Sequence, residues 1–152
     1  MIPLKELDGE EDNKHMTEKN WALLNGLALA YVGDAIYETY IRDYLVEQGY
    51  TKPSQLHKTA THFVSAKAQS FLMHEMLAEE DFLTEEEVTM YKRGRNSKSY
   101  TSAKNADITT YRVATGFESL MGYLHLAKRT ERMEELIQWC IKKVEDTKDD
   151  KR

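Results

Sequence analysis

The sequence has 152 residues, of which 41% are hydrophobic and 31% charged, and its formal net charge is −5. This length and composition predict a single domain with a hydrophobic core. No segment approaches the roughly 18 consecutive apolar residues of a membrane-spanning helix, so no such helix is expected. The first 14 residues are acidic and contain no apolar stretch, so they do not resemble a secretory signal. We therefore expect a cytoplasmic protein without a membrane partner.

The single cysteine, Cys140, excludes an internal disulfide and any metal site built from several cysteines. It lies in an apolar stretch beside Trp139 and Ile141, which predicts a buried thiol. The five histidines are not spaced as metal ligands on a helix, so we interpret them as surface or core-edge residues.

Apolar residues recur with helical spacing, and alternating strand patterns are absent. We predict an all-α bundle of six to seven helices over residues 17–146, between an acidic flexible tail (1–16) and a frayed charged tail (147–152). The first helix should run from about Glu18 to Gln48 and end at Gly49, a suitable C-cap glycine. The later helices are expected over about 53–63, 65–79, 84–92, 107–128 and 130–146. Thr84 and Glu87 form a capping-box pattern, while Asp107 and Thr130 are candidate N-caps.

Charge is segregated along the chain. The stretch from Glu75 to Glu87 holds seven acids and no Lys or Arg, whereas residues 88–106 hold five bases and no acid. This segregation suits a protein that presents one basic edge to a polyanion, although two differently solvated faces would give the same pattern. Gly94 to Asn105 is polar and is predicted to be a loop.

Two carboxylates fall on helical stripes that should face the core. At 100° per residue, Asp34 shares a stripe with Leu23, Leu27, Ala30, Ile41 and Leu45, and Glu118 lies among small and apolar neighbours such as Ala114 and Gly122. A salt bridge between helices, or a break at Gly33, would also explain Asp34. If the two helices pack together, the acids can converge as hard oxygen ligands of the kind that Mg²⁺ prefers.

Three segments resemble the ribonuclease III family. Leu29-Ala-Tyr-Val-Gly-Asp-Ala-Ile-Tyr-Glu38 resembles the signature helix, Ala114-Thr-Gly-Phe-Glu-Ser-Leu-Met-Gly-Tyr-Leu124 is similar to the family's second acidic segment, and His62-Phe-Val-Ser-Ala-Lys67 matches a segment between them. The order and spacing agree over roughly residues 20 to 128. The resemblance implies the family's helical catalytic-domain fold and an endoribonuclease that cleaves double-stranded RNA with Mg²⁺.

The departures from the family pattern are specific. Family acids are replaced at Leu27, Ala30 and Thr115, which leaves the number of metal ions open. No segment resembles a double-stranded-RNA-binding domain. This pattern is similar to the Mini-ribonuclease III branch of the family.

Residue by residue, the resemblance implies that Asp34 and Glu118 are catalytic and metal-binding. Glu38 is interpreted as a surface or supporting residue. The acid-free segment is expected to contact RNA in place of the missing domain, with Tyr100 as a further candidate. The predicted RNA-binding residues are Arg93, Arg95, Asn96, Lys98 and Lys104.

The resemblance also implies a homodimer, 5′-phosphate and 3′-hydroxyl products, and a precursor of large-subunit ribosomal RNA as substrate. An accessory ribosomal protein stays open as a further partner. Two other hypotheses are a catalytically degenerate protein that binds structured RNA and a helical interaction protein without an RNA role. Magnesium-dependent cleavage of duplex RNA separates the first hypothesis from both.

Overall fold

The computed structural model describes residues 20–97 and 107–150, and these residues are entirely helical apart from turns and short connections. A short 3-10 helix and six α-helices occur in the described ranges, in agreement with the predicted all-α bundle. The elements are η2 (Trp21–Leu23), α2 (Gly26–Glu47), α3 (Pro53–Val64), α4 (Ala66–Ala78), α5 (Glu85–Arg95), α6 (Ile108–Leu126) and α7 (Thr130–Asp150). The predicted acidic tail, residues 1–16, lies outside the described residues.

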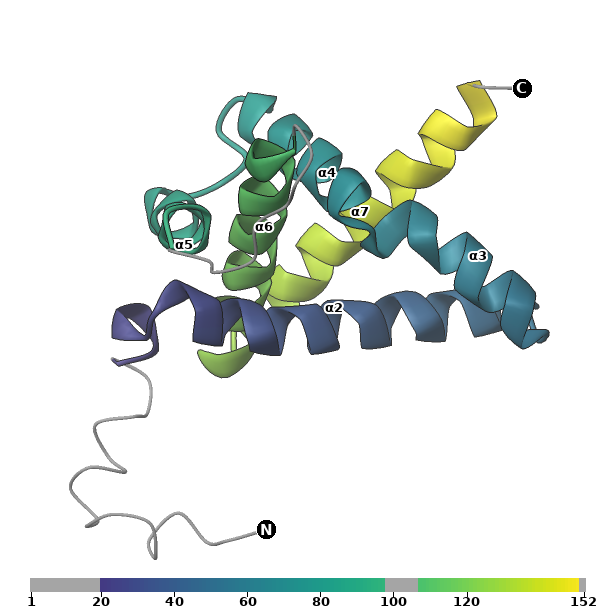
Figure 1. Cartoon of the computed structure of the whole chain (residues 1–152), viewed down its shortest axis with the longest axis horizontal. Helices are drawn as coiled ribbons and strands as arrows, with labels where there is room; N and C mark the ends of the chain where they lie inside the picture. The colour runs from purple at the N-terminus through teal and green to yellow at the C-terminus, as the bar shows by residue number, and fades with distance from the viewer. Residues whose placement is uncertain (1–19, 98–106, 151–152) are drawn as a thin grey trace, which may run out of the picture.

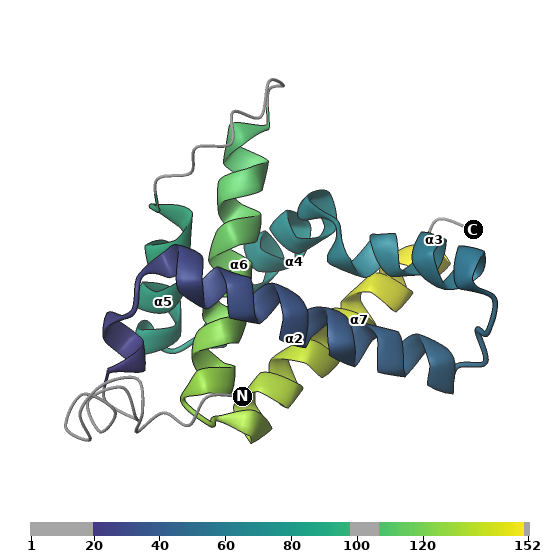
Figure 2. The same ribbon diagram turned by 60° about the horizontal axis from the view of Figure 1, so that its bottom comes forward.

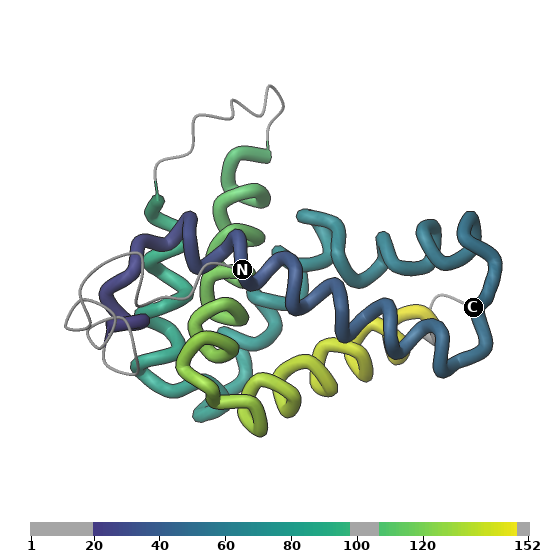
Figure 3. Tube along the Cα trace, turned by 90° about the horizontal axis from the view of Figure 1, so that it is seen from below, coloured from purple at the N-terminus to yellow at the C-terminus, as the bar shows by residue number. Residues whose placement is uncertain are grey.

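Helix α6 is the central element. It crosses α2 steeply, with α5 on one side and α4 and α3 towards the other end of α2 (Figures 1 and 2). Helix α7 returns obliquely across the bundle, as the view from below shows (Figure 3). None of the helices in the described ranges has the length and apolar character needed to span a membrane.

The first predicted helix is divided in two. Leu24 and Asn25 are extended, so η2 ends there, and α2 begins at Gly26 with Asn25 as its N-cap. The Asn25 side-chain oxygen accepts a hydrogen bond from the backbone N–H of Ala28 at 2.9 Å, which satisfies one of the free donors at the helix start. Leu23 and Leu27 consequently leave the predicted apolar stripe and are 74% and 40% exposed.

Two other helix ends, those of α5 and α7, differ from the prediction, and the predicted caps Asp107 and Thr130 do not act as expected. Helix α5 continues through Arg95, so the predicted loop begins at Asn96 rather than at Gly94. Asp107 occupies the N-cap position of α6 but makes no capping hydrogen bond through its side chain. Helix α7 already includes Thr130 and extends to Asp150, beyond its predicted end. The predicted Gly49 terminator is confirmed, because it follows the last turn of α2 with φ of +102°.

The predicted capping box is confirmed and has a second role. Thr84 Oγ1 accepts from the Glu87 N–H at 3.1 Å, and Glu87 Oε1 accepts from the Thr84 N–H at 3.0 Å. The buried Glu87 carboxylate also accepts from Arg132 of α7, with a Nε–Oε2 distance of 2.8 Å. Burial alone would raise the pKa of Glu87, but the Arg132 and Thr84 hydrogen bonds outweigh it and lower that pKa. One carboxylate therefore starts α5 and joins it to α7.

The buried ring of Tyr37 joins α2 to two other helices. Its hydroxyl donates to the backbone carbonyl of Phe63 at 3.1 Å, at the end of α3. Its ring meets Phe117 of α6 edge to face, with centroids 4.9 Å apart. These contacts anchor α2 in the core one turn beyond Asp34.

Helices α2 and α6 cross with their backbones in direct contact. A Cβ atom at Gly33 would overlap the carbonyl oxygen of Glu118, and one at Gly122 would overlap the carbonyl oxygen of Leu29. Gly122, one of the small neighbours of Glu118 noted from the sequence, therefore allows α2 to approach closely. Both glycines are needed because any side chain would push the helices apart.

We predict that Gly33→Ala or Gly122→Ala lowers the free energy of unfolding by about 3 kcal/mol or more, at the upper end of overpacking effects. The sign is informative, because alanine at an uncrowded helix glycine stabilises by about 0.5–1 kcal/mol. Urea titration followed by circular dichroism would measure the change. The matched control is Thr39→Ala on the exposed side of α2, which should change stability by less than about 0.5 kcal/mol. Unchanged or increased stability in the glycine variants would contradict the close crossing.

Candidate active site

Glu118 is held by the most deeply buried helix of the protein. Every residue of α6 from Val113 to Leu124 is buried except Glu118, which is partly exposed. Its neighbours along the chain, Phe117 and Ser119, are fully buried. An ionisable side chain therefore extends from the centre of the core towards its boundary with α2.

Asp34 lies on the other side of that boundary. It follows Gly33, the residue that contacts the Glu118 carbonyl, and its own side chain is exposed. Asp34 lines an open groove of about 400 Å³ between α2 and the end of α6, together with Tyr31, Thr39 and His125. Asp34 thus faces solvent, and Glu118 approaches Asp34 from within the bundle.

The two carboxyl groups meet. Burial raises the pKa of Glu118 to about 8, and the hydrogen-bonding approach and negative charge of Asp34 act in the same direction. The side-chain amide of Gln69 on α4 opposes this shift, and nothing in the sequence pattern indicated Gln69 as a site residue. The predicted convergence of the two acids is observed and results from the glycine-mediated crossing, but the predicted core-facing stripe of Asp34 is wrong, because Asp34 is exposed.

The alternative explanations for Asp34 are not observed. Helix α2 runs through Gly33 without a break. None of the ion pairs formed within the described ranges includes Asp34 or Glu118. A pair of acids without a compensating base is costly, and it is typical of a site that binds a proton or a cation.

The donor set fits a magnesium ion better than a transition metal. Within the described residues no three His, Cys, Asp or Glu side chains form a cluster that could hold a metal. Mg²⁺ commonly takes only one or two protein carboxylates and completes its octahedron with water and substrate phosphate oxygens. Asp34 and Glu118 fit that arrangement, and His125 is exposed at the groove.

The positions that lack the family acids have other roles here. Ala30 and Thr115 are buried, and the Thr115 hydroxyl donates to the Tyr111 carbonyl at 3.0 Å within α6. Glu38 forms an ion pair with Arg42 one turn further along α2, in agreement with its interpretation as a surface residue. Cys140 is fully buried, as predicted, and burial raises the pKa of its thiol.

Arg93 is committed to the fold. It belongs to the last turn of α5, and its guanidinium donates to the backbone carbonyls of Ala22 and Leu24 at the start of the described chain. The sequence pattern predicted that this residue belongs to an RNA-binding loop. The structure instead uses it to hold η2 against α5.

Arg95 and Asn96 lie at the end of the same helix. The Arg95 guanidinium is 5.4 Å from the centroid of the Tyr91 ring, and its Nε donates to the Asn96 side-chain oxygen at 3.1 Å. Asn96 is exposed and Arg95 is partly exposed, so both can be reached from solvent. The other candidates, Lys98, Tyr100 and Lys104, lie outside the described residues.

Comparison with known proteins identifies the family. The family model of the Ribonuclease III domain matches residues 27–129, a range that contains both Asp34 and Glu118. The chain belongs to the ribonuclease III family. It is therefore an endoribonuclease, and its substrate class is double-stranded RNA.

Similar proteins place the chain near one branch of this family. It is 73% identical to a Mini-ribonuclease 3 from Enterococcus faecalis over 129 residues, covering 85% of this chain and 97% of that protein. A Mini-ribonuclease 3 from Streptococcus pneumoniae is 58% identical and covers 81% of this chain and 95% of its own length. A crystal structure from Fusobacterium nucleatum shares the fold with a TM-score of 0.66 and 34% identity, covering 78% of this chain and 92% of that one.

The raised pKa of Glu118 predicts a pH-dependent stability in the absence of divalent cations. The folded protein keeps the Glu118 proton up to about pH 8, whereas an unfolded glutamate loses it near pH 4.3. Between these values the folded state binds more protons, so the free energy of unfolding decreases as the pH rises from about 5 to 8. Glu118→Gln should remove this component. Melting temperatures in EDTA at several pH values would test it, and parallel pH profiles for the two proteins would contradict it.

Proposed function

We propose that this endoribonuclease hydrolyses double-stranded RNA with a magnesium ion held by Asp34 and Glu118. The convergence of these two carboxyl groups at the crossing of α2 and α6 carries the proposal. A bound magnesium ion would supply an activated water and would neutralise charge on the scissile phosphate. Following the resemblance, the products would carry 5′-phosphate and 3′-hydroxyl ends.

The two acids differ in their exposure to solvent. Glu118 extends from α6, whose other residues from Val113 to Leu124 are buried. Asp34 is exposed at the groove, where a phosphate oxygen could approach from solvent. Both acids must be ionised to bind a cation, so cation binding must displace the proton that Glu118 retains up to about pH 8.

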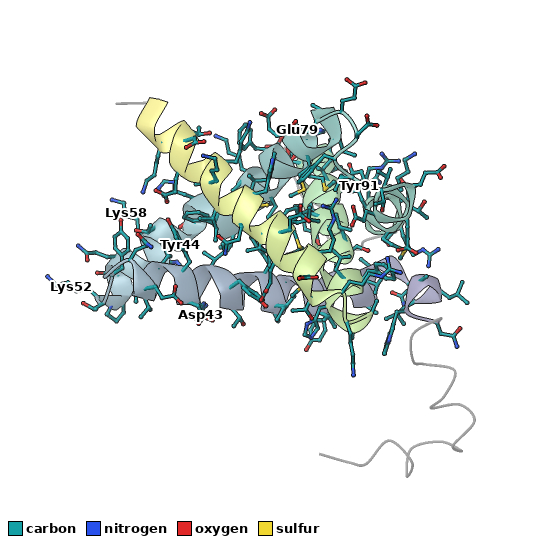
Figure 4. All side chains as sticks on the ribbon, turned by 180° about the vertical axis from the view of Figure 1, so that it is seen from behind. Asp43, Tyr44, Lys52, Lys58, Glu79 and Tyr91 are labelled. Carbon is teal, nitrogen blue, oxygen red and sulfur yellow. The ribbon has the colours of Figure 1, made fainter. Side chains whose placement is uncertain are left out.

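Asp34→Asn and Glu118→Gln should each abolish cleavage while the helical fold is retained. Both replacements remove a charge at nearly constant shape. Cleavage of a long RNA duplex with saturating Mg²⁺ would be measured, with Asp43→Asn as the control because Asp43 is an exposed acid on the same helix (Figure 4). A loss of less than about tenfold, or roughly 1.4 kcal/mol of transition-state stabilisation, would remove that acid from the list of principal ligands.

The same assay addresses the alternative of a degenerate RNA-binding protein. Losses of acids at Leu27, Ala30 and Thr115 motivate that alternative. A wild-type protein that binds duplex RNA in Ca²⁺ but does not cut it in Mg²⁺ would establish it.

We propose a homodimer in which each subunit cuts one strand of the duplex, leaving short 3′ overhangs. The resemblance implies dimerisation through the signature helix, and the start of this region carries exposed apolar side chains. These are Leu23, Leu27 and Tyr31, and Tyr31 is 82% exposed. Large exposed apolar side chains on neighbouring turns are typical of a surface covered by another chain.

Leu27→Glu should convert the dimer into a monomer and reduce double-strand cutting, because it places a charge in an apolar contact. Light scattering at micromolar concentration would measure the mass. Val46→Glu is the matched control, since Val46 is 55% exposed near the other end of α2. A monomeric wild-type protein with full double-strand cutting would refute the dimer.

We propose that the end of α5 and the segment that follows it bind the RNA backbone. Arg95, Asn96, Lys98 and Lys104 carry this role, while Arg93 is left out because it binds backbone carbonyls within the fold. A-form RNA offers phosphates and 2′-hydroxyls rather than an accessible major-groove code, so modest sequence preference is expected. Basic residues supply the phosphate contacts, and Asn96 can hydrogen-bond to sugar or phosphate oxygens.

Arg95→Gln combined with Lys98→Gln should weaken duplex binding and reduce the log–log salt slope by about one unit for each lost phosphate contact. Cleavage at saturating RNA should persist, because Asp34 and Glu118 are unchanged. The matched control combines Lys52→Gln with Lys58→Gln, which removes the same charge at the opposite end of the molecule from Tyr91 (Figure 4). If wild type and the double variant show equal salt slopes of duplex binding, the RNA does not contact Arg95 or Lys98.

The natural substrate is proposed to be a precursor of large-subunit ribosomal RNA in the cytoplasm. The resemblance to the Mini-ribonuclease III branch supports the substrate, and the composition of the sequence supports the compartment. An accessory ribosomal protein remains part of the hypothesis as a further partner.

A further inference from the structure

Gln69 is a buried polar residue whose side chain is not satisfied within the protein. It lies on α4, is 2% exposed, and its neighbours on the buried face of that helix include Leu72, Met73 and Met76. Its amide nitrogen Nε2 is the one buried side-chain nitrogen or oxygen in the described part of the chain that lacks a hydrogen-bond partner. Buried amides are normally hydrogen-bonded, so an unpaired one calls for an explanation.

The Gln69 amide is directed at the site. The amide lies within hydrogen-bonding reach of the Glu118 carboxyl group, although no acceptor meets Nε2 with a well-aligned bond. Glu118 therefore has two polar neighbours, Asp34 and Gln69, which act on its carboxylate in opposite directions. Asp34 repels the carboxylate, and the Gln69 N–H attracts it.

A carboxylate that binds a cation has a second oxygen available for another donor. Protein groups that hydrogen-bond to metal ligands fix the orientation of those ligands, and their loss weakens metal affinity. A neutral amide suits this position, because it donates to an ionised carboxylate without adding a charge that would compete with the cation.

We propose that Gln69 is a positioning residue for the proposed cation site: its Nε2–H donates to the ionised Glu118 carboxylate and fixes that carboxylate towards Asp34. The inference rests on the proposed function of Asp34 and Glu118. It assigns the buried, unpaired amide to the cation-bound state of the site.

The position of Gln69 within the fold supports this assignment over simple space filling. Methionine matches glutamine in length and would fill the same volume among the neighbouring methionines without an unpaired donor. A residue kept only for packing would gain nothing from the amide. The two roles therefore predict opposite consequences of removing it.

The test is Gln69→Met, with Gln69→Leu as a second apolar variant of different shape. Both variants should have melting temperatures in EDTA equal to or higher than wild type, because the unpaired amide is removed. Their affinity for Mn²⁺ should fall about tenfold or more, measured without RNA by electron paramagnetic resonance of the free ion. Ser70→Ala, a change at the adjacent buried residue, is the matched control and should keep wild-type affinity.

The outcomes separate this inference from the function on which it rests. If wild type binds Mn²⁺ and Asp34→Asn or Glu118→Gln prevents binding, the site is established. Unchanged Mn²⁺ affinity in a folded Gln69 variant then overturns the positioning role alone. If wild type does not bind Mn²⁺ through these acids, both proposals are overturned. If both Gln69 variants lose folding stability while Ser70→Ala does not, Gln69 is structural and the inference is overturned.

Discussion

The backbone contact between α2 and α6 is the constraint on which the rest of the structure depends. Gly33 and Gly122 lack the side chains that would separate the two helices. The Glu118 carbonyl contacts Gly33, and Asp34 is the next residue, so the same contact brings the two acids together. Because both acids are carried by regular helices rather than loops, their separation is set by packing, which is the more rigid way to build a site.

Bringing the two carboxyl groups together is electrostatically unfavourable, and the packing of the surrounding core must compensate for it. Glu118 is partly buried beside another carboxyl group, and both effects raise its pKa to about 8. Where a structural acid is buried elsewhere in the protein, it is neutralised: Glu87 is paired with Arg132. The two glutamates therefore differ: Glu87 joins two helices through an ion pair, whereas Glu118 forms no ion pair within the described residues and has a raised pKa.

The sequence predicted the features that depend on local pattern, and it predicted the convergence of Asp34 and Glu118 only on the condition that their helices pack together. The capping box at Thr84 and the terminator Gly49 are local, and both predictions are correct. The prediction of one long first helix was wrong. Asn25 lies within a run of leucine and alanine residues that is typical of a helix, but it is extended and acts as the N-cap of α2. Gln69 could not be found from sequence, because nothing in the spacing of α4 indicates that its amide meets a residue 49 positions later.

Helix α6 also fixes the distance between the acids and the basic end of α5. A Cβ at Gly94 would overlap the side chain of Ser119, and one at Gly116 would overlap the ring of Tyr91. Ser119 directly follows Glu118 in α6. Its hydroxyl donates to the Met90 carbonyl of α5 at 3.0 Å. The helix that carries Glu118 therefore also holds the turn that carries Arg95, without an intervening loop. The position of Arg95 relative to Glu118 is therefore set by the packing of α5 against α6.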